Sequence, residues 1–208
     1  MLDHCFCLNL DRRLDRWEAF CERLPHDWPF PTPARISAVD GRQCRIPESW
    51  KATPGAYGCM LSHRLILERA AENSERVLIL EDDAVFRTGF SELAKRLLCE
   101  VPTGWHQLYF GGEHDKLLPS SAVRPGLVRC HGTRKTHAYV VSPEGAAQLA
   151  IALQSADTHV DCVFHKLHQR IASYAASPWL VGQAAGVSDI FGLQSRVGEN
   201  FWDEVPHG

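Results

Sequence analysis

The sequence has no dominant charge, no long apolar run and no internal repeat. A formal net charge of -3 over 208 residues gives little attraction to nucleic acid, so nucleic acid is not an expected partner. No apolar run approaches the ~18 residues of a membrane span, and the first residues lack the basic stretch and long apolar core of a signal peptide. We therefore expect no integral membrane segment and a cytoplasmic protein, with a peripheral position at the inner membrane as the alternative.

Paired cysteines and phosphate-binding glycine loops are also missing. Eight cysteines are present, but they are dispersed and form no CxxC pair, so we predict reduced, mostly buried thiols. A structural zinc site is not expected because it would need four ligands at short paired spacings. Cys5 and Cys7 more simply share one face of a strand. The absence of a GxxxxGK[ST] loop excludes the common type of ATPase.

The composition, with 45% hydrophobic and 23% charged residues, is typical of a soluble globular protein with one substantial core. We predict a single domain over residues 1–208, with its core at about 4–191 and a tail at 192–208.

Hydrophobic periodicity predicts strands that alternate with amphipathic helices. Predicted strands are Cys5–Leu10, Arg35–Val39, Val77–Leu80, His106–Phe110, which Gly111-Gly112 should stop, and Ala138–Val141. Predicted helices are Leu14–Leu24, Gly58–Asn73, one from Thr88 or Ser91 to Glu100, Gly145–Leu153 capped by Ser142, and Cys162–His168. This alternation predicts an α/β fold with a mainly parallel central sheet flanked by helices. Ligands of such sheets bind outside the carboxyl ends of the strands.

Three consecutive carboxylates, Glu81, Asp82 and Asp83, interrupt the apolar run from Val77 to Phe86. They fall where a buried strand leaves the core, and they repel one another. Mg²⁺ or Mn²⁺ relieves such repulsion by taking oxygen ligands and completes its shell with substrate phosphates and water. The triplet therefore indicates a metal and phosphate site, with a solvated acidic turn as the alternative.

An ordered series of motifs resembles glycosyltransferase family 25, which includes bacterial lipooligosaccharide and procollagen galactosyltransferases. The resemblance covers most of residues 4–191. It rests on Leu8-Asn9-Leu10-Asp11-Arg12-Arg13 with Asp15-Arg16, Ala38-Val39-Asp40-Gly41, Gly58-Cys59-Met60-Leu61-Ser62-His63, Ile79-Leu80-Glu81-Asp82-Asp83, the stretch Thr136 to Ser142, and Gln183 through Ser188-Asp189-Ile190.

The resemblance implies a GT-A type fold and transfer of a sugar, commonly galactose from UDP-galactose, with inversion at the anomeric carbon, as in lipopolysaccharide biosynthesis. It implies Mn²⁺, or Mg²⁺, as cofactor, a UDP-sugar as donor and a glycan or protein hydroxyl as acceptor. Asp83 would be the main metal ligand. Glu81 would reach the metal, a metal-bound water or the ribose, and Asp82 would support either role.

Two further donor-binding residues follow by resemblance from the first strand-to-helix turn. Asn9 and Arg13 match the start of the family's nucleotide site, where an arginine can steady base or phosphate. Arg12 and Arg16 could instead be surface charges, and we favour this interpretation for Arg16.

The second strand end and the next helix complete the predicted donor site. Asp40, with Gly41, would accept hydrogen bonds from uracil or ribose, and a plain Asp-Gly turn is the alternative. Ser62 and His63 would open a helix whose free backbone N–H groups face an anion, whereas a lone histidine is more often packed or capping.

Inversion needs a base within hydrogen-bond reach of the acceptor hydroxyl. Asp161 is the first candidate, with a helix N-cap as its alternative role. Asp189 is the second candidate and could instead be a further metal ligand. Two other functions remain open, namely a metal-dependent nucleotidyltransferase or phosphohydrolase, and a non-catalytic sugar-nucleotide-binding module.

Overall fold

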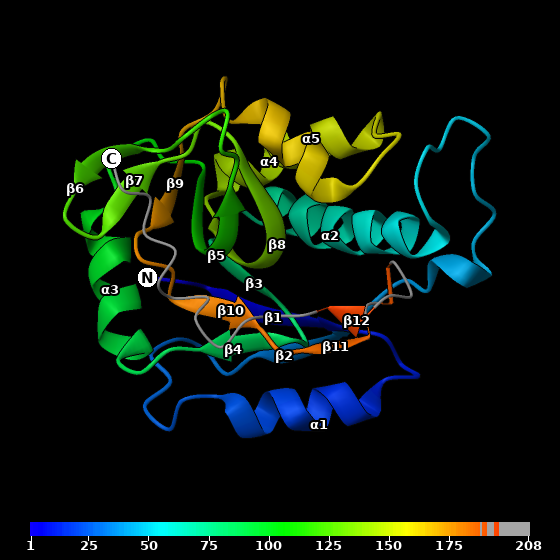
Figure 1. Cartoon of the computed structure of the whole chain (residues 1–208), viewed down its shortest axis with the longest axis horizontal. Coiled ribbons are helices and arrows are strands. Elements are labelled where there is room, and N and C mark those ends of the chain that lie inside the picture. The colour runs from blue at the N-terminus through cyan, green and yellow to red at the C-terminus, as the bar shows by residue number, and fades with distance from the viewer. Residues whose placement is uncertain (188, 191–193, 196–208) are drawn as a thin grey trace.

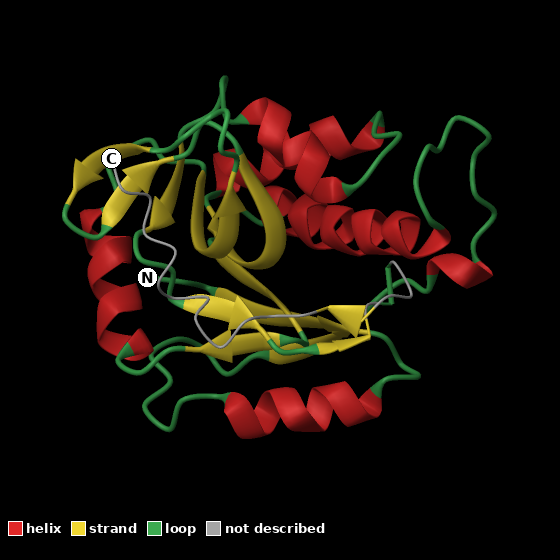
Figure 2. Ribbon diagram, in the orientation of Figure 1, coloured by secondary structure: helices red, strands yellow, loops and turns green. Residues whose placement is uncertain are grey.

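The computed structural model describes residues 1–187, 189–190 and 194–195, and it has three layers, with a central sheet between two sets of helices (Figures 1 and 2). The predicted tail at 192–208 lies outside the described residues except for Gln194 and Ser195, and so does Ser188 of the last motif. The predicted α/β class is confirmed.

The main sheet has eight strands in the order β2-β1-β3-β8-β5-β9-β7-β6. Strands β1, β2 and β3 are mutually parallel, β8 is antiparallel to β3 and β5, and β9 is parallel to β5. Because β7 and β6 reverse direction in turn, every strand of this sheet except β7 and β8 runs the same way. The bounds are His4–Asn9 (β1), Ala34–Ser37 (β2), Val77–Glu81 (β3), Gln107–His114 (β5), Ser121–Arg124 (β6), Leu127–Arg129 (β7), Thr133–Val141 (β8) and Ser173–Ala176 (β9).

Two short antiparallel pairs extend the structure beside the main sheet. Ala84–Phe86 (β4) pairs with Val181–Gln183 (β10), and Gly186–Val187 (β11) pairs with Gln194–Ser195 (β12). The apolar run that follows the acidic triplet is therefore a separate strand, β4, and it pairs with a strand from the C-terminal part of the chain.

Alternating side chains of the central strands point into two separate cores, as strand geometry requires. Val77 and Ile79 of β3 belong to a core shared with helices Pro54–Glu72 (α2), Pro143–Gln154 (α4) and Val160–Leu167 (α5). Leu78 and Leu80 belong to the other core, which Leu14–Arg23 (α1) and Phe90–Glu100 (α3) cover. Figure 1 shows α1 and α2 on opposite sides of the sheet.

All eight cysteines are free in the structure, and Cys5 and Cys7 share one core as predicted. Burial is more limited than expected, since Cys21 and Cys99 are exposed. Every helix in the described residues is too short or too polar to cross a membrane.

Three predicted element ends are wrong. The helix expected from Gly58 begins at Pro54, where the Thr53 side chain accepts a hydrogen bond from the Ala56 N–H, so Ser62 and His63 lie inside α2 and their backbone N–H groups do not open it. Gly111-Gly112 continues β5 through irregular register instead of stopping it. Helix α3 is preceded by Gly89 in a left-handed conformation, without a side-chain cap from Thr88 or Ser91.

Close backbone packing joins α2 to the turn after β2. A Cβ atom on Gly58 would lie 2.2 Å from the Val39 carbonyl oxygen and 2.5 Å from the Gly41 nitrogen. The Ser62 hydroxyl strengthens this contact, because it accepts a 2.8 Å hydrogen bond from the Val39 N–H. Only glycine at position 58 lets the helix and the turn meet at the edge of the sheet.

Gly58→Ala should destabilise the protein by on the order of 1–3 kcal/mol, the usual cost of overpacking. Alanine gains up to about 1 kcal/mol of helix propensity over glycine, but backbone atoms at this distance cannot give way cheaply. Urea unfolding measures the difference. Gly186→Ala is the control, since a Cβ there meets nothing within 4 Å. Equal stability of the two variants would contradict the packing argument.

Candidate active site

A cavity of about 700 Å³ opens where β1 and β3 end. Its wall combines the turn after β1, the start of α1, the inner face of α2, the end of β3, and residues from the start of β8 and α5. Most of the predicted site residues line it, namely Arg13, Asp40, Gly41, Ser62, His63, Glu81, Asp82, Asp83, Asp161 and Asp189. The tertiary structure thus brings together residues that are up to 176 positions apart in sequence.

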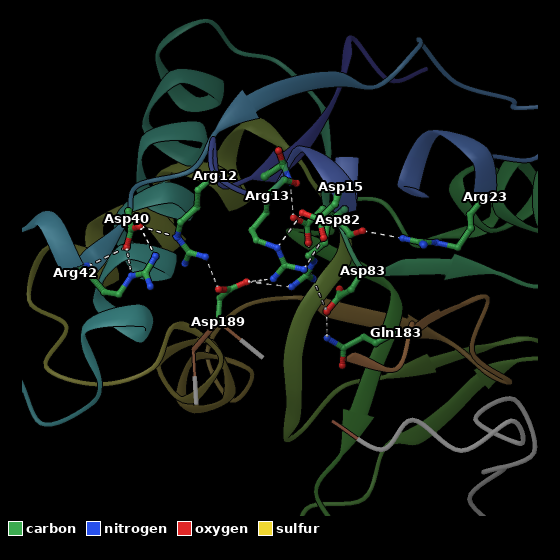
Figure 3. A network of polar contacts seen from close by, with 12 residues as sticks. Arg12, Arg13, Asp15, Arg23, Asp40, Arg42, Asp82, Asp83, Gln183 and Asp189 are labelled. Carbon is green, nitrogen blue, oxygen red and sulfur yellow. Dashed lines mark hydrogen bonds and ion pairs between the residues drawn. The ribbon is translucent and has the colours of Figure 1, made fainter. Parts of the chain in front are cut away.

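Asp189 is held by three arginines from the turn after β1 and the first turns of α1. Its Oδ1 lies 2.7 Å from Arg12 Nη1, and its Oδ2 lies 2.7 Å from Arg13 Nη1 and 3.4 Å from Arg16 Nη1. Figure 3 shows this carboxylate between the guanidinium groups of Arg12 and Arg13. Both oxygens of Asp189 are therefore engaged by cations in this arrangement.

Arg16, favoured as a surface charge, instead lies in the centre of the site. Its guanidinium pairs with Asp82 and lies 3.2 Å from Asp83 Oδ2, in addition to its contact with Asp189. Its side chain is 20% exposed. The prediction that Arg16 is a surface charge is wrong, because the first turns of α1 face the acidic end of β3. The amphipathic pattern of the helix does not reveal this arrangement.

Asn9 does not line the cavity but supports a residue that does. It is buried, and its Nδ2 donates to Asp82 Oδ2 at 2.7 Å and to the Arg13 carbonyl at 2.8 Å. Its Oδ1 accepts from Arg35 Nε at 2.8 Å. Asn9 therefore orients Asp82 and the arginine turn with both of its amide hydrogens, and its predicted contact with a nucleotide stays a prediction.

Asp83 is the carboxylate with the most unfavourable environment. Burial and the nearby charge of Glu81 raise its pKa from 3.8 to about 7, against the opposing effect of Arg16. Its Oδ2 accepts a 3.3 Å hydrogen bond from Gln183, and its Oδ1 is buried with no hydrogen-bond partner in the part of the chain described. This oxygen can accept a proton or a cation.

Glu81, by contrast, is stabilised in its ionised form. Burial acts to raise its pKa, but His63 and a 2.7 Å hydrogen bond from Thr136 outweigh burial and lower the pKa to about 2. The His63 ring is fully buried, with Nε2 at 3.4 Å from Glu81 Oε1 and Nδ1 at 2.8 Å from the Tyr139 hydroxyl. Two acids at the same strand end thus differ in proton affinity, since the pKa of Asp83 is raised and that of Glu81 is lowered.

The Asp40 turn is a short 3-10 helix, Gly41–Gln43 (η1), capped by the Asp40 side chain. The same carboxylate lies 2.9 Å from Arg12 Nε and 2.9 Å from Arg42 Nη2. A structural role of Asp40 is therefore present, and its predicted contact with uracil or ribose stays a prediction.

Asp161 lies in the first turn of α5, whose N-cap is His159, so the alternative role of Asp161 as the N-cap is wrong. Its Oδ2 accepts a 3.2 Å hydrogen bond from the Lys135 N–H, and the side chain lines the cavity. Helix α5 covers the face of the sheet opposite to α1. Asp161 and the arginines therefore reach the cavity from different layers.

Sequence reasoning missed several cavity residues, including Cys59, Arg134, Lys135, Thr136 and Gln183. Cys59 and Thr136 lie inside the motifs quoted above, but neither was predicted as a site residue. The signals that could have identified them are the nearness of Cys59 to His63 and the place of Thr136 near the start of a strand. Gln183 begins the last of the motifs quoted above, but it comes from β10, a strand too short to show a period in sequence.

Comparison with known proteins gives the same family that the motifs indicate. The family model described as "Glycosyltransferase family 25 (LPS biosynthesis protein)" matches residues 43–117, which contain α2 and the acidic triplet. A "Glycosyltransferase 25 family member" of Anopheles gambiae is 30% identical over 173 residues, covering 71% of this chain. The chain is related to glycosyltransferase family 25.

Two further relatives qualify this relationship. The Drosophila melanogaster "Glycosyltransferase 25 family member" is 31% identical over 73% of the chain, and a human protein named "Inactive glycosyltransferase 25 family member 3" is 27% identical over 97%. The chain spans only 28% of each insect protein and 40% of the human one. The activity of the whole relatives therefore cannot simply be transferred to it.

Likeness to solved structures is distant. "Crystal Structure of A197 from STIV" gives a TM-score of 0.38 and 12% identity, covering 89% of this chain and 86% of that one. A UDP-glucose pyrophosphorylase from acinetobacter baumanii gives a TM-score of 0.39 and 9% identity, covering 79% of this chain and 58% of that one. Neither likeness is close enough to indicate a function.

Asp83→Asn should become more stable relative to the unchanged protein as pH rises from 4 to 7. With its folded pKa at about 7, Asp83 keeps a proton that the unfolded chain releases near pH 4, so its contribution to stability falls through this window. Asparagine cannot ionise, and the expected gain is on the order of 3 kcal/mol. Denaturant unfolding at several pH values measures it.

Asp157→Asn is the matched control, because Lys51 lowers the pKa of that carboxyl, so its effect should be nearly constant from pH 4 to 7 and change, with the opposite sign, below pH 4. A stability difference for Asp83→Asn that stays flat from pH 4 to 7 would show that Asp83 is not a high-pKa group.

Proposed function

We propose that this chain carries the donor site of an inverting glycosyltransferase that moves a sugar from a UDP-sugar to a hydroxyl of a glycan or protein. Galactose is the first sugar to test, because the resemblance to galactosyltransferases suggests it. The family relationship supports sugar transfer as the class of reaction.

The observation that carries the proposal is the arrangement of charge in the cavity. Arg12, Arg13 and Arg16 converge on a single carboxylate, that of Asp189, beside the end of β3. Guanidinium groups bind phosphate oxygens as they bind carboxylates, often through two parallel hydrogen bonds. A nucleoside diphosphate placed here would exchange Asp189 for its own phosphates.

The residues present also fit a divalent cation. Asp83 Oδ1 is buried without a hydrogen-bond partner among the described residues, and burial and Glu81 raise the pKa of this carboxyl despite Arg16, so its negative charge is only partly compensated. Asp83, with Glu81, would hold Mn²⁺ or Mg²⁺. When bound, the ion would neutralise charge that develops on the leaving diphosphate.

The transfer step needs one base. As the acceptor oxygen forms its bond to the anomeric carbon, the bond from that carbon to the diphosphate breaks, and the nucleoside diphosphate leaves with the electron pair. Asp161 accepts the acceptor's proton in this proposal. Asp161 and the arginines line the same cavity from opposite layers, and the proposal places the sugar between them.

A non-catalytic role is the second candidate, because relatives of the chain include proteins named as inactive members of the family. In that case the cavity would bind a sugar nucleotide without transfer. The separate measurement of binding and turnover distinguishes the two functions.

Asp83→Ala should abolish Mn²⁺-dependent binding of UDP, because Asp83 supplies a buried cavity oxygen that has no hydrogen-bond partner in the described part of the chain. Calorimetric titration of the purified chain with UDP, with and without Mn²⁺, measures this, and slow UDP release from UDP-galactose and UDP-glucose gives the donor preference. Asp157→Ala, which lies outside the cavity, is the control.

Several outcomes would count against the proposal. UDP affinity that is equal in Asp83→Ala and the unchanged chain would remove Asp83 from the donor site. Release of pyrophosphate or inorganic phosphate would favour a nucleotidyltransferase or phosphohydrolase. Tight UDP binding without turnover on any acceptor would favour the non-catalytic role.

Asp161→Asn should leave UDP affinity nearly unchanged and lower transfer by about 10²-fold or more, the scale of the loss of a general base. The amide keeps the size of the side chain but cannot take a proton. Initial rates with saturating donor measure the effect, with Asp189→Asn measured in parallel. Normal transfer by Asp161→Asn together with a loss in Asp189→Asn would move the base to Asp189.

A further inference from the structure

Three side chains with different ligand atoms converge on one wall of the cavity. Cys59 and His63 are four residues apart on α2, so they lie on the same face of the helix, and Glu81 ends the neighbouring strand β3. The Cys59 sulfur, a His63 nitrogen and a Glu81 oxygen all lie within 4.8 Å of one another. In the described part of the chain, no other group of three such residues is placed this way.

His63 supplies the independent observation that points to a ligand. Its ring is fully buried, yet Nε2 has no hydrogen-bond partner in the described residues and meets Glu81 Oε1 at the 3.4 Å of a long ion-pair contact. A buried polar atom without a partner is rare, because it loses its hydration and gains nothing in return. The position between a thiol and a carboxylate suits a bound cation.

The surroundings orient these side chains as outer-shell groups orient metal ligands. The Tyr139 hydroxyl lies 2.8 Å from His63 Nδ1, and it fixes the ring so that Nε2 faces Glu81. Thr136 donates to Glu81 Oε1 at 2.7 Å. Histidine ligands of metals typically have their second nitrogen engaged in this way.

We propose that Cys59, His63 and Glu81 bind one zinc ion, with a fourth position open to the cavity. Sulfur and imidazole ligands favour Zn²⁺ over Mn²⁺ or Mg²⁺, which prefer oxygen. Three protein ligands and an open position are the arrangement of zinc sites that bind water or substrate. This site differs from the one proposed for Asp83, although the two share Glu81.

Zinc content tests the proposal without any donor or acceptor. The chain is stripped with a chelator, equilibrated with Zn²⁺, and assayed for metal by elemental analysis, and Co²⁺ is added in parallel as a coloured substitute. We expect about one zinc per chain and a cobalt spectrum with a thiolate charge-transfer band. Cys59→Ser should lower zinc affinity by at least the roughly 10–100-fold that the loss of an outer-shell partner costs.

Two controls separate the site from its neighbours. Cys162→Ser changes another thiol of the same cavity wall and should keep the zinc, and Asp83→Ala should keep it as well. Circular dichroism confirms that each variant is folded, and His63→Gln repeats the test on a second ligand. These measurements leave UDP binding aside, so the failure of the donor-site proposal would not affect them.

Substoichiometric zinc in the unchanged chain would overturn the proposal. So would zinc affinity in folded Cys59→Ser equal to that of Cys162→Ser, or a cobalt complex without a thiolate band.

Discussion

The ion pairs between the arginines of α1 and the carboxylates at the end of β3 are the interaction on which the site depends. Adjacent carboxylates cannot be gathered in a partly buried cavity unless cations compensate their charge. Arg16 compensates Asp82 and Asp83 together, and Asn9 holds Asp82 from the side of the core. Arg23 adds hydrogen bonds to the Asp82 and Ala84 carbonyls, so the chain leaves β3 along a defined path.

Arg12, Arg13 and Arg16 tie the C-terminal part of the described chain to the site. Besides its ion pairs, the segment at Asp189 and Ile190 packs against the start of α2, where Thr53 donates to the Ile190 carbonyl at 2.7 Å. Gly55 permits this approach, since a Cβ there would lie 2.5 Å from the Asp189 carbonyl oxygen. A phosphate that binds the arginines would therefore act on the position of this segment as well as on the cavity.

The elements that could be predicted are those whose periodicity is long and regular. Strand β3 and helices α1 and α4 form near their predicted bounds, and the Ser142 cap of α4 is confirmed by its 3.0 Å hydrogen bond from the Gly145 N–H. Strands β6, β7, β9 and β10 were not predicted. They have three or four residues each, too few to show a local period, and the partners of β9 and β10 are also distant in sequence.

The sequence by itself determined the α/β class, the strand-end place of Glu81, Asp82 and Asp83, and the relationship to family 25, because these depend on local pattern and on ordered motifs. Only the tertiary structure decided which charges meet. It turned Arg16 inward, gave Asp83 a high pKa and Glu81 a low one, and set Cys59 beside His63 and Glu81. The reason is physical, since burial and the distance between charges govern ionisation and ligand binding, and both arise when separate elements pack together.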